Sequence, residues 1–338
     1  MALADILFPF ADLSRFWWLP LAAILLDRII GDPPAWPHPV RHIGFLCNVI
    51  EPQIRQKIPS ERLAGCAATL LVLCCVWNFV WLFLLFPLFF AAIIALYFGF
   101  SGLALGQLLR EGTSAVVFLE NNDVTNARHA IGMLVSRDVS QADHATLCRT
   151  LAETLAENVN DAFIAPLFWF LLGGPVGLWL YKAASTMDSM WGYPHEPWTR
   201  FGSAAARLDD IMAFFPARVT TLFLYAAMRL CQKGTLRKIR IQETLFWPGF
   251  NRVAEDARKM KSPNAGWPMA ACAWIHHAAM GGMAVYAGKT VEKPLLGPSG
   301  TAWTTAKIRD LLTILTVAGY GGACVLLSCG WLFHTAIR

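Results

Sequence analysis

The feature that most constrains the fold is an apolar run from Leu63 to Leu105, which carries no charged residue from Ala64 onward. A transmembrane helix needs about 20 apolar residues to cross a hydrocarbon layer about 30 Å thick. The run is therefore long enough for two spans, and we expect a tight turn between Asn78 and Pro87. Composition agrees, because only 15% of the 338 residues are charged whereas soluble domains carry about a quarter.

Further apolar segments predict an all-α, polytopic membrane protein with about 4–6 membrane segments. Leu311 to Phe333 predicts another clear span. Phe16 to Ile30 is shorter, so it either crosses at a tilt or lies near the interface. Ile211 to Cys231 contains Arg218 near its centre. A central Arg costs about 2.5–3.5 kcal/mol on insertion scales, so we expect Arg218 to face a polar cavity.

The segment from Phe163 to Tyr181 is also long enough to cross, but Gly173-Gly174-Pro175 interrupts it at the midpoint. Such a triplet is a strong signal for the end of a helix. Two half-helices that form a re-entrant hairpin are at least as consistent with the sequence as one continuous span. A hairpin would return Lys182 and Asp188 to the side of the acidic segment that precedes Phe163.

The remaining stretches predict amphipathic helices on the polar side of the membrane, around 106–162 and 232–268, within one domain that covers 1–338. Apolar residues recur at helical spacing in the first stretch, with a turn at 121–123. Eight Lys or Arg lie between Cys231 and Pro268, which places this stretch on the cytoplasmic side by the positive-inside rule. The basic residues are otherwise dispersed and the net charge is +5, which gives no case for nucleic acid as a partner.

An acidic motif follows the first stretch. Glu153, Glu157 and Asp161 would share one face of a helix, at positions i, i+4 and i+8. Like charges at this spacing repel each other, and no Lys or Arg occurs between Arg149 and Lys182. Because oxygen ligands suit Mg²⁺, the motif predicts a Mg²⁺ or substrate site. The alternative is a solvated acidic face.

A proline-rich loop between residues 27 and 44 predicts fixed side chains. Asp32 ends the first helix, and the prolines that follow restrict the backbone around His38 and Arg41. These two side chains would then be held toward a ligand. The alternative is a loop that leaves the membrane, with Trp36 at the interface.

Two further motifs are consistent either with ligand binding or with a purely structural role at a helix end. Asp209 and Asp210 lie between Arg207 and Arg218 and would bind a metal–phosphate group, or they would simply begin a helix, where acids are favoured. Residues 262–268 form a polar turn around Asn264, which alone is typical of a helix cap. The sequence contains no GxxxxGK[ST], GxGxxG, HExxH or GxSxG motif.

Taken in order, these segments resemble the adenosylcobinamide-phosphate synthase family, membrane proteins of late cobalamin biosynthesis. The similarity covers about residues 24 to 310. The chain departs from the family at 158–162, which read NVNDA where NTVDG is typical, and at Met269, where an acid is common. The motifs that carry the resemblance are DRIIGDPPAWPHPVRHIG (27–44), ETLAENVNDAFIAPLF (153–168), GGP (173–175), YKAASTMDSMWGY (181–193), RLDDIMAFFPAR (207–218), SPNAGWP (262–268) and GG…Y.G…KP.LG (281–297).

The resemblance implies an amide-forming ligase. A carboxylate of adenosylcobyric acid is joined to aminopropanol, or to its O-phosphate, to give adenosylcobinamide (phosphate). ATP and Mg²⁺ drive the step, because a carboxylate does not condense with an amine in water without activation. The family also implies a multi-pass protein of the inner membrane, with its active face in the cytoplasm and other enzymes of cobalamin assembly as further partners. The alternative is a related corrinoid-binding, sensory or scaffold membrane protein without catalysis.

Residue chemistry and motif order then give hypotheses for the site. Acids would receive the amine proton or hold Mg²⁺, and basic or amide side chains would hold phosphates and substrate. The catalytic set is Glu153, Glu157, Asp161 and Asp188; the metal set is Glu157, Asp161, Asp209 and Asp210; the substrate and phosphate set is Asp32, His38, Arg41, Asn158, Lys182, Arg207, Arg218 and Asn264.

Overall fold

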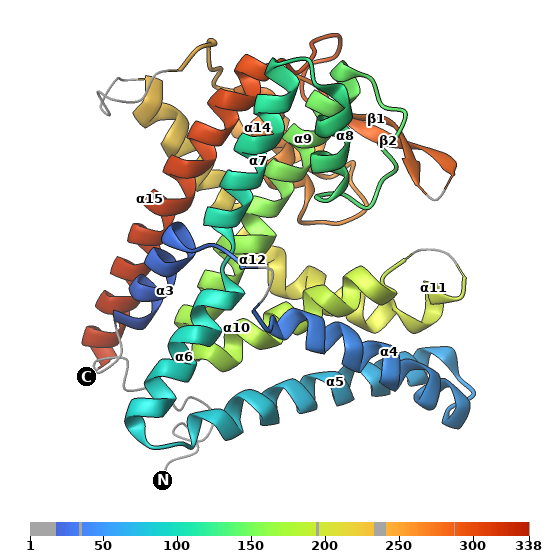
Figure 1. Ribbon diagram of the computed structural model, residues 1–338, viewed down its shortest axis with the longest axis vertical. Coiled ribbons are helices and arrows are strands. Elements are labelled where there is room, and N and C mark those ends of the chain that lie inside the picture. The colour runs from blue at the N-terminus through green and yellow to red at the C-terminus, as the bar shows by residue number, and fades with distance from the viewer. Residues whose placement is uncertain (1–17, 34–35, 194–195, 233–240, 287, 338) are drawn as a thin grey trace. The chain divides into compact units, whose positions relative to one another are not determined.

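The computed structural model describes residues 18–33, 36–193, 196–232, 241–286 and 288–337 (Figure 1). The chain divides into two compact units, each made of several chain segments. Unit 1 comprises Met1–Ala104, Asp161–Ala213 and Cys324–Arg338. Unit 2 comprises Leu105–Asn160 and Phe214–Ala323. That residues 1–338 form one domain stays a prediction.

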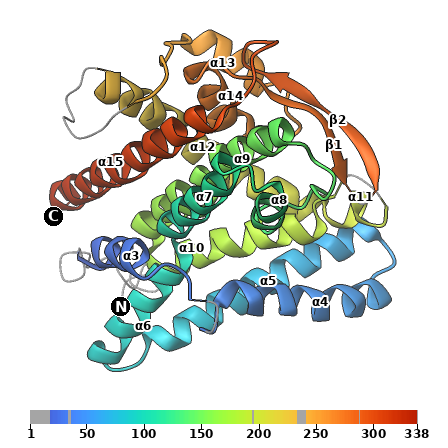
Figure 2. The same ribbon diagram turned by 45° about the horizontal axis from the view of Figure 1, so that its top comes forward.

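Unit 1 is built from packed helices. Helix α5 packs against α4 and α10, and α3 packs against α6; Figure 2 shows α4 and α5 side by side. The helices are α3 (Trp18–Ile29), α4 (Pro39–Lys57), α5 (Glu61–Leu84), α6 (Leu88–Gly102), α10 (Ala165–Trp191) and α11 (Trp198–Phe201), with parts of α12 (Ser203–Gln232) and α15 (Thr305–Ile337).

The two predicted spans at the start of unit 1 are confirmed as α5 and α6, and the turn between them lies at residues 85–87. Helix α3 has 12 residues, which is about 18 Å at 1.5 Å per residue. The described part of this helix is therefore shorter than the hydrocarbon layer is thick.

The predicted hairpin is confirmed within α10, whereas its re-entry into a membrane stays a prediction. Gly173 and Gly174 leave helical geometry, and Gly174 takes φ 60° and ψ −157°, a conformation that favours glycine. A Cβ built on Gly177 would lie 2.5 Å from the carbonyl oxygen of Trp169. Eight residues of straight helix would separate these positions by about 12 Å. The chain therefore folds back at the glycine pair.

Unit 2 combines helices with one β-hairpin that the sequence analysis missed. Strands β1 (Met280–Tyr286) and β2 (Lys289–Leu296) pair antiparallel. Helix α9 packs against α7, α8, α14 and β1. The helices are α7 (Leu105–Glu120), α8 (Val124–Gly132), α9 (His144–Val159), α13 (Phe250–Ala257) and α14 (Gly266–Ile275), with the remaining parts of α12 and α15.

Helices occur in both stretches for which polar-side helices were predicted. Helices α7, α8 and α9 cover most of 106–162, and α13 lies in 232–268, of which residues 233–240 fall outside the described part of the chain. Their placement on the polar side of a membrane stays a prediction.

Among the described residues, five helical runs are long and apolar enough to cross a membrane. The prediction of a polytopic helical membrane protein is confirmed by these runs. The run that contains α9 and α10 includes the hairpin, so it is not one straight span. The five runs are Glu61–Leu84, Phe89–Glu120, His144–Trp191, Ser203–Gln232 and Thr305–Leu332.

Candidate functional site

Polar side chains of unit 1 gather where the α10 hairpin brings its second half back to Asp161. Asp161 lies in the π-helix η1 (Asn160–Ile164), and the Nζ of Lys182 lies 3.5 Å from its backbone oxygen. The hydroxyl of Tyr181 donates to Oδ1 of Asp161 at 3.5 Å. The predicted return of Lys182 to the acidic segment is therefore confirmed.

Three more acids join this group from α10 and α12. Asp209 interacts electrostatically with Asp161, Asp188 and Asp210, and all four carboxylates are half-buried. Lys182 is attracted by Asp161 and by the buried Asp27. We call Asp161, Tyr181, Lys182, Asp188, Asp209 and Asp210 the hairpin cluster.

Asp209 has the least satisfied side chain of the hairpin cluster. Its buried Oδ1 has no hydrogen-bond partner among the residues that the structure describes. A carboxylate oxygen that faces three other acids in a half-buried site is costly unless a cation or proton joins it. Such an arrangement is typical of sites that bind a ligand rather than of structural ion pairs.

The proline-rich loop adds a fixed histidine to the same unit. His38 caps α4, because its Nδ1 accepts from the backbone N–H of Val40 at 3.2 Å. Its Nε2 lies 3.6 Å from Oδ2 of Asp32. Burial lowers the pKa of His38, although Asp32 opposes this effect, and the charge of Lys182 acts on the same ring. His38 is thus held as the prolines predicted, whereas Arg41 is exposed.

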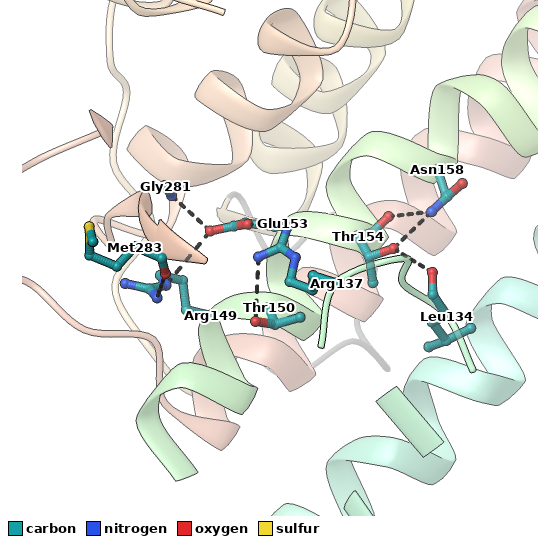
Figure 3. Close-up of polar contacts among 9 residues, drawn as sticks. All are labelled: Leu134, Arg137, Arg149, Thr150, Glu153, Thr154, Asn158, Gly281 and Met283. Atoms are coloured by element: carbon teal, nitrogen blue, oxygen red, sulfur yellow. Dashed lines mark hydrogen bonds and ion pairs between the residues drawn. The ribbon is translucent and has the colours of Figure 1, made fainter. Parts of the chain in front are cut away.

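The buried acid of unit 2, Glu153, has different surroundings from the acids of the hairpin cluster. Glu153 is fully buried, and its Oε2 lies 2.7 Å from Nη2 of Arg137. Its Oε1 accepts from the backbone N–H of Gly281 at 2.7 Å and lies 3.8 Å from Nε of Arg149. Figure 3 shows Glu153 among these groups, which come from α9, the loop before it and β1. This environment favours a structural role for Glu153.

The two main partners of Glu153 were not predicted from the sequence. Arg137 lies in a loop with no recognisable motif. Gly281 takes a positive φ of 95°, and a Cβ there would lie 2.0 Å from the carbonyl oxygen of Pro294. The GG pair at 281–282 was the available signal, since paired glycines mark positions where only glycine fits.

Glu157 and Asn158 also belong to unit 2. Glu157 is half-buried and interacts electrostatically with Arg137. The amide of Asn158 donates to the carbonyl and hydroxyl oxygens of Thr154, both at 2.9 Å. Helix α9 ends at Val159, where the π-helix begins. Glu153, Glu157 and Asp161 therefore do not lie in one uninterrupted α-helix.

Two predicted substrate residues meet each other in unit 2. Nη1 of Arg218 donates to Oδ1 of Asn264 at 2.9 Å, and Nη2 donates to the carbonyl of Pro263 at 3.2 Å. The guanidinium lies 3.5 Å from the ring centroid of Phe214. Arg218 thus ties α12 to the turn at 262–268. Arg207, which belongs to unit 1, is exposed.

Two residues at which the chain departs from the family pattern, Asn160 within 158–162 and Met269, are buried in unit 2. Oδ1 of Asn160 accepts from the hydroxyl of Thr220 at 3.0 Å, and Met269 is buried in α14. Neither residue belongs to the hairpin cluster.

Within the described residues, no group of three or more His, Cys, Asp or Glu side chains is placed to hold a metal ion alone. This finding is compatible with Mg²⁺, which usually takes one or two carboxylates together with substrate phosphates and waters. The oxygen donors of the hairpin cluster, as far as the structure describes them, do not form a closed metal cage.

The family described as CobD/Cbib protein matches residues 20–315. The chain belongs to the CobD/CbiB family. It is 38% identical over 284 residues to cobalamin biosynthesis protein CobD of Klebsiella pneumoniae, covering 81% of this chain and 85% of that protein. It is 34% identical to CbiB of Salmonella typhi (88% and 92% covered) and 34% identical to CobD of Geobacter metallireducens (90% and 93%). No solved structure matches the chain.

Membership of the family places the chain in cobalamin biosynthesis, because its relatives carry that description. The five candidate spans agree with a multi-pass membrane protein of this family.

Proposed function

We propose that this CobD/CbiB protein joins a carboxylate of adenosylcobyric acid to the amine of aminopropanol, or of its O-phosphate, in a step driven by ATP and Mg²⁺. The observation that carries the proposal is the approach of Lys182 to Asp161 in unit 1, together with the unpartnered oxygen of Asp209. A cation and crowded acids around an unsatisfied carboxylate suit a metal-bound triphosphate.

The chemistry needs an activated carboxylate, an amine without its proton and charge balance around phosphate. ATP supplies the activation. Asp209 and Asp161 would hold the Mg²⁺ that accompanies the nucleotide, with Asp210 beside them. Lys182 would neutralise phosphate oxygens, as a compact point charge does in other phosphate sites.

The amine must lose a proton when the amide bond forms. Asp188 is half-buried and is repelled by Asp210 and Asp161, so it is the group of the hairpin cluster that we assign as proton acceptor. Acids crowded by like charges hold a proton more readily than exposed ones, which suits general base catalysis near neutral pH.

His38, Asp32 and Arg41 would meet the polar end of a substrate. His38 is within electrostatic range of Lys182, so the loop and the hairpin cluster act on neighbouring parts of one ligand. Glu157, Asn158, Arg207, Arg218 and Asn264 stay predictions for substrate contact, whereas Glu153 is assigned a structural role.

We also propose that the site faces the cytoplasm from the inner membrane, and that other enzymes of cobalamin assembly act beside it. The support is the chemistry of the proposed step, because the ATP that it needs is supplied in the cytoplasm.

The test is an assay of the purified protein in lipid nanodiscs with adenosylcobyric acid, aminopropanol phosphate or aminopropanol, ATP and Mg²⁺. Mass spectrometry should show the amide product, and omission of ATP or Mg²⁺ should remove it. Lys182→Met should lower the rate by about 10²-fold or more, while Lys182→Arg should restore only part of it.

The matched control is Glu61→Gln, which removes the half-buried ion pair with Arg55 between α4 and α5 and should leave the rate unchanged. Corrinoid binding by a folded wild-type protein that forms no amide under any of these conditions would contradict the proposal. That result would favour the sensory or scaffold alternative.

A further inference from the structure

An apolar pocket of about 520 Å³ lies in unit 1 among α4, α5 and α6, close to the hairpin cluster but separate from it. Its volume is in the range of about 300–1,000 Å³ that is typical of small-molecule sites. Its walls are formed mainly by aliphatic and aromatic side chains, among them Ile43, Val76, Phe79, Val80, Ile94 and Phe98.

Three polar groups in the wall of the pocket lie within hydrogen-bond distance of backbone carbonyls. The hydroxyl of Tyr97 donates to the carbonyl of Pro37, and Nε1 of Trp179 donates to the carbonyl of Phe98 at 3.1 Å. Nδ1 of His42 lies 3.2 Å from the carbonyl of His38. A ligand rich in amides or phosphates would lose its hydrogen bonds to water here and find few in the pocket to replace them, which is unfavourable. The pocket therefore suits an alkyl chain.

The position of the pocket indicates where such a chain comes from. Helix α5 and the run that contains α6 are both candidate membrane spans. Two wall residues are also exposed at the surface, Phe79 on α5 and Phe45 on α4. The same two spans expose further large apolar side chains, including Leu71 and Phe90. The pocket thus continues into a surface that lipid tails cover.

We propose that this pocket binds an acyl chain of a membrane phospholipid. The bound chain would lie against Trp179, whose ring is 6.5 Å from that of His38. Because His38 caps α4 and fixes the loop beside the hairpin cluster, an occupied pocket would keep that loop in place. The lipid is then a structural ligand of the unit that holds the candidate site.

The proposal is tested with a phosphatidylcholine that carries a photoreactive diazirine in one acyl chain, added to the full-length protein in detergent micelles. Crosslinked peptides are identified by mass spectrometry. We expect saturable labelling in residues 75–83 and 94–98 that unlabelled phosphatidylcholine displaces. Labelling that rises linearly with lipid, and equally around Leu71, would overturn the proposal.

Two matched substitutions on α5 sharpen the result. Val76→Trp fills the pocket and should abolish the saturable labelling, whereas Leu71→Trp adds the same side chain at an exposed position outside the pocket and should leave the labelling intact. If Val76→Trp does not fold, Val80→Phe and the competition in the wild-type protein decide the question.

Adenosylcobyric acid serves as a second competitor. Displacement of the label by this corrinoid but not by phosphatidylcholine would make the pocket a substrate site and contradict the lipid proposal. The crosslinking does not depend on turnover, so a failed amide assay leaves this inference standing, and a failed crosslink leaves the proposed reaction standing.

Discussion

Two acids in the two units of this protein meet opposite surroundings. Glu153 in unit 2 is fully buried; its Oε2 forms an ion pair with Arg137, and its Oε1 accepts from the backbone N–H of Gly281. Asp209 in unit 1 is half-buried, faces three other acids and keeps one oxygen unpartnered among the described residues. The difference separates an acid that holds the fold from an acid suited to a ligand, which sequence alone does not distinguish because both are simply carboxylates in apolar helices.

The largest effect on stability is expected when Glu153, the acid paired with Arg137, is substituted. Glu153→Gln removes the carboxylate that pairs directly with the guanidinium of Arg137, and breaking a buried pair in this way typically costs about 3–5 kcal/mol. We expect a large fall in the thermal unfolding midpoint in detergent, together with loss of activity that follows the loss of folded protein.

A double substitution checks the cause. Arg137→Met with Glu153→Leu removes both charges, and replacing a whole buried pair by apolar side chains is often close to neutral. Recovery of most of the lost stability is expected. If Glu153→Gln alone keeps wild-type stability but loses all activity, Glu153 takes part in the reaction. The contrast between a structural Glu153 and a ligand-binding Asp209 would then be wrong.

The opposite pattern is expected for Asp209→Asn. The substitution removes charge repulsion from the hairpin cluster, so stability should stay the same or rise by about 1 kcal/mol, as is common when an acid at a functional site is neutralised. Amide formation should fall by about 10²-fold or more, because a metal-binding oxygen is lost. Thermal unfolding and product formation are measured on the same sample, and a large fall in stability would show that Asp209 is structural.

A smaller effect on stability is expected when Arg218 is substituted. Its guanidinium is committed to Asn264, to the carbonyl of Pro263 and to the ring of Phe214. Arg218→Lys keeps the charge but loses the planar stacking and the paired hydrogen bonds. We expect about 1–2 kcal/mol of lost stability with an unchanged KM for ATP. A rise in that KM at wild-type stability would instead support the predicted phosphate contact.

The smallest effect is the pH dependence of stability that His38 contributes. Because the folded protein lowers the pKa of His38, the unfolded chain binds the proton more tightly, and stability should decrease as pH falls below the unfolded value of about 6.5. Protonation also removes the cap on α4, which is worth about 1 kcal/mol. Hydrogen exchange in the first turn of α4 should therefore accelerate below that pH, after correction for the intrinsic rate.

Asp32→Asn tests the cause of this pH dependence. Asp32 favours the protonated ring, whereas Arg41 and Lys182 disfavour it. Without Asp32 the pKa of His38 should fall further, so α4 should open more at low pH. Asp138→Asn changes an exposed acid of unit 2 and should have no such effect. An exchange profile that is the same at pH 7 and pH 5 would contradict the account of the cap.

Much of the fold follows from the sequence for clear physical reasons. The uncharged run to Leu105 predicted spans in lipid. Gly173-Gly174-Pro175 predicted a break because such a triplet is a strong helix stop, and this favoured a hairpin at least as much as one continuous span. The β-hairpin at 280–296 was missed, because the alternation of apolar and polar residues in its strands is weak.

The candidate site was less predictable. The hairpin explained how Lys182 meets Asp161, yet the helical spacing of Glu153, Glu157 and Asp161 suggested one acidic face where the structure has a π-helix and two separate units. Which acid is paired depends on Arg137, a loop residue distant from any motif. Pairing of this kind is a property of the tertiary structure.

The most direct test of the account is to locate the bound metal. Fe²⁺ is substituted for Mg²⁺ in the presence of ATP, peroxide and ascorbate then generate hydroxyl radicals at the metal, and the cleaved positions are identified by mass spectrometry. The account predicts ATP-dependent cleavage near Asp161, Lys182 to Asp188 and Asp209. Cleavage confined to unit 2, around Glu153 or Arg218, with none at the hairpin cluster, would contradict it.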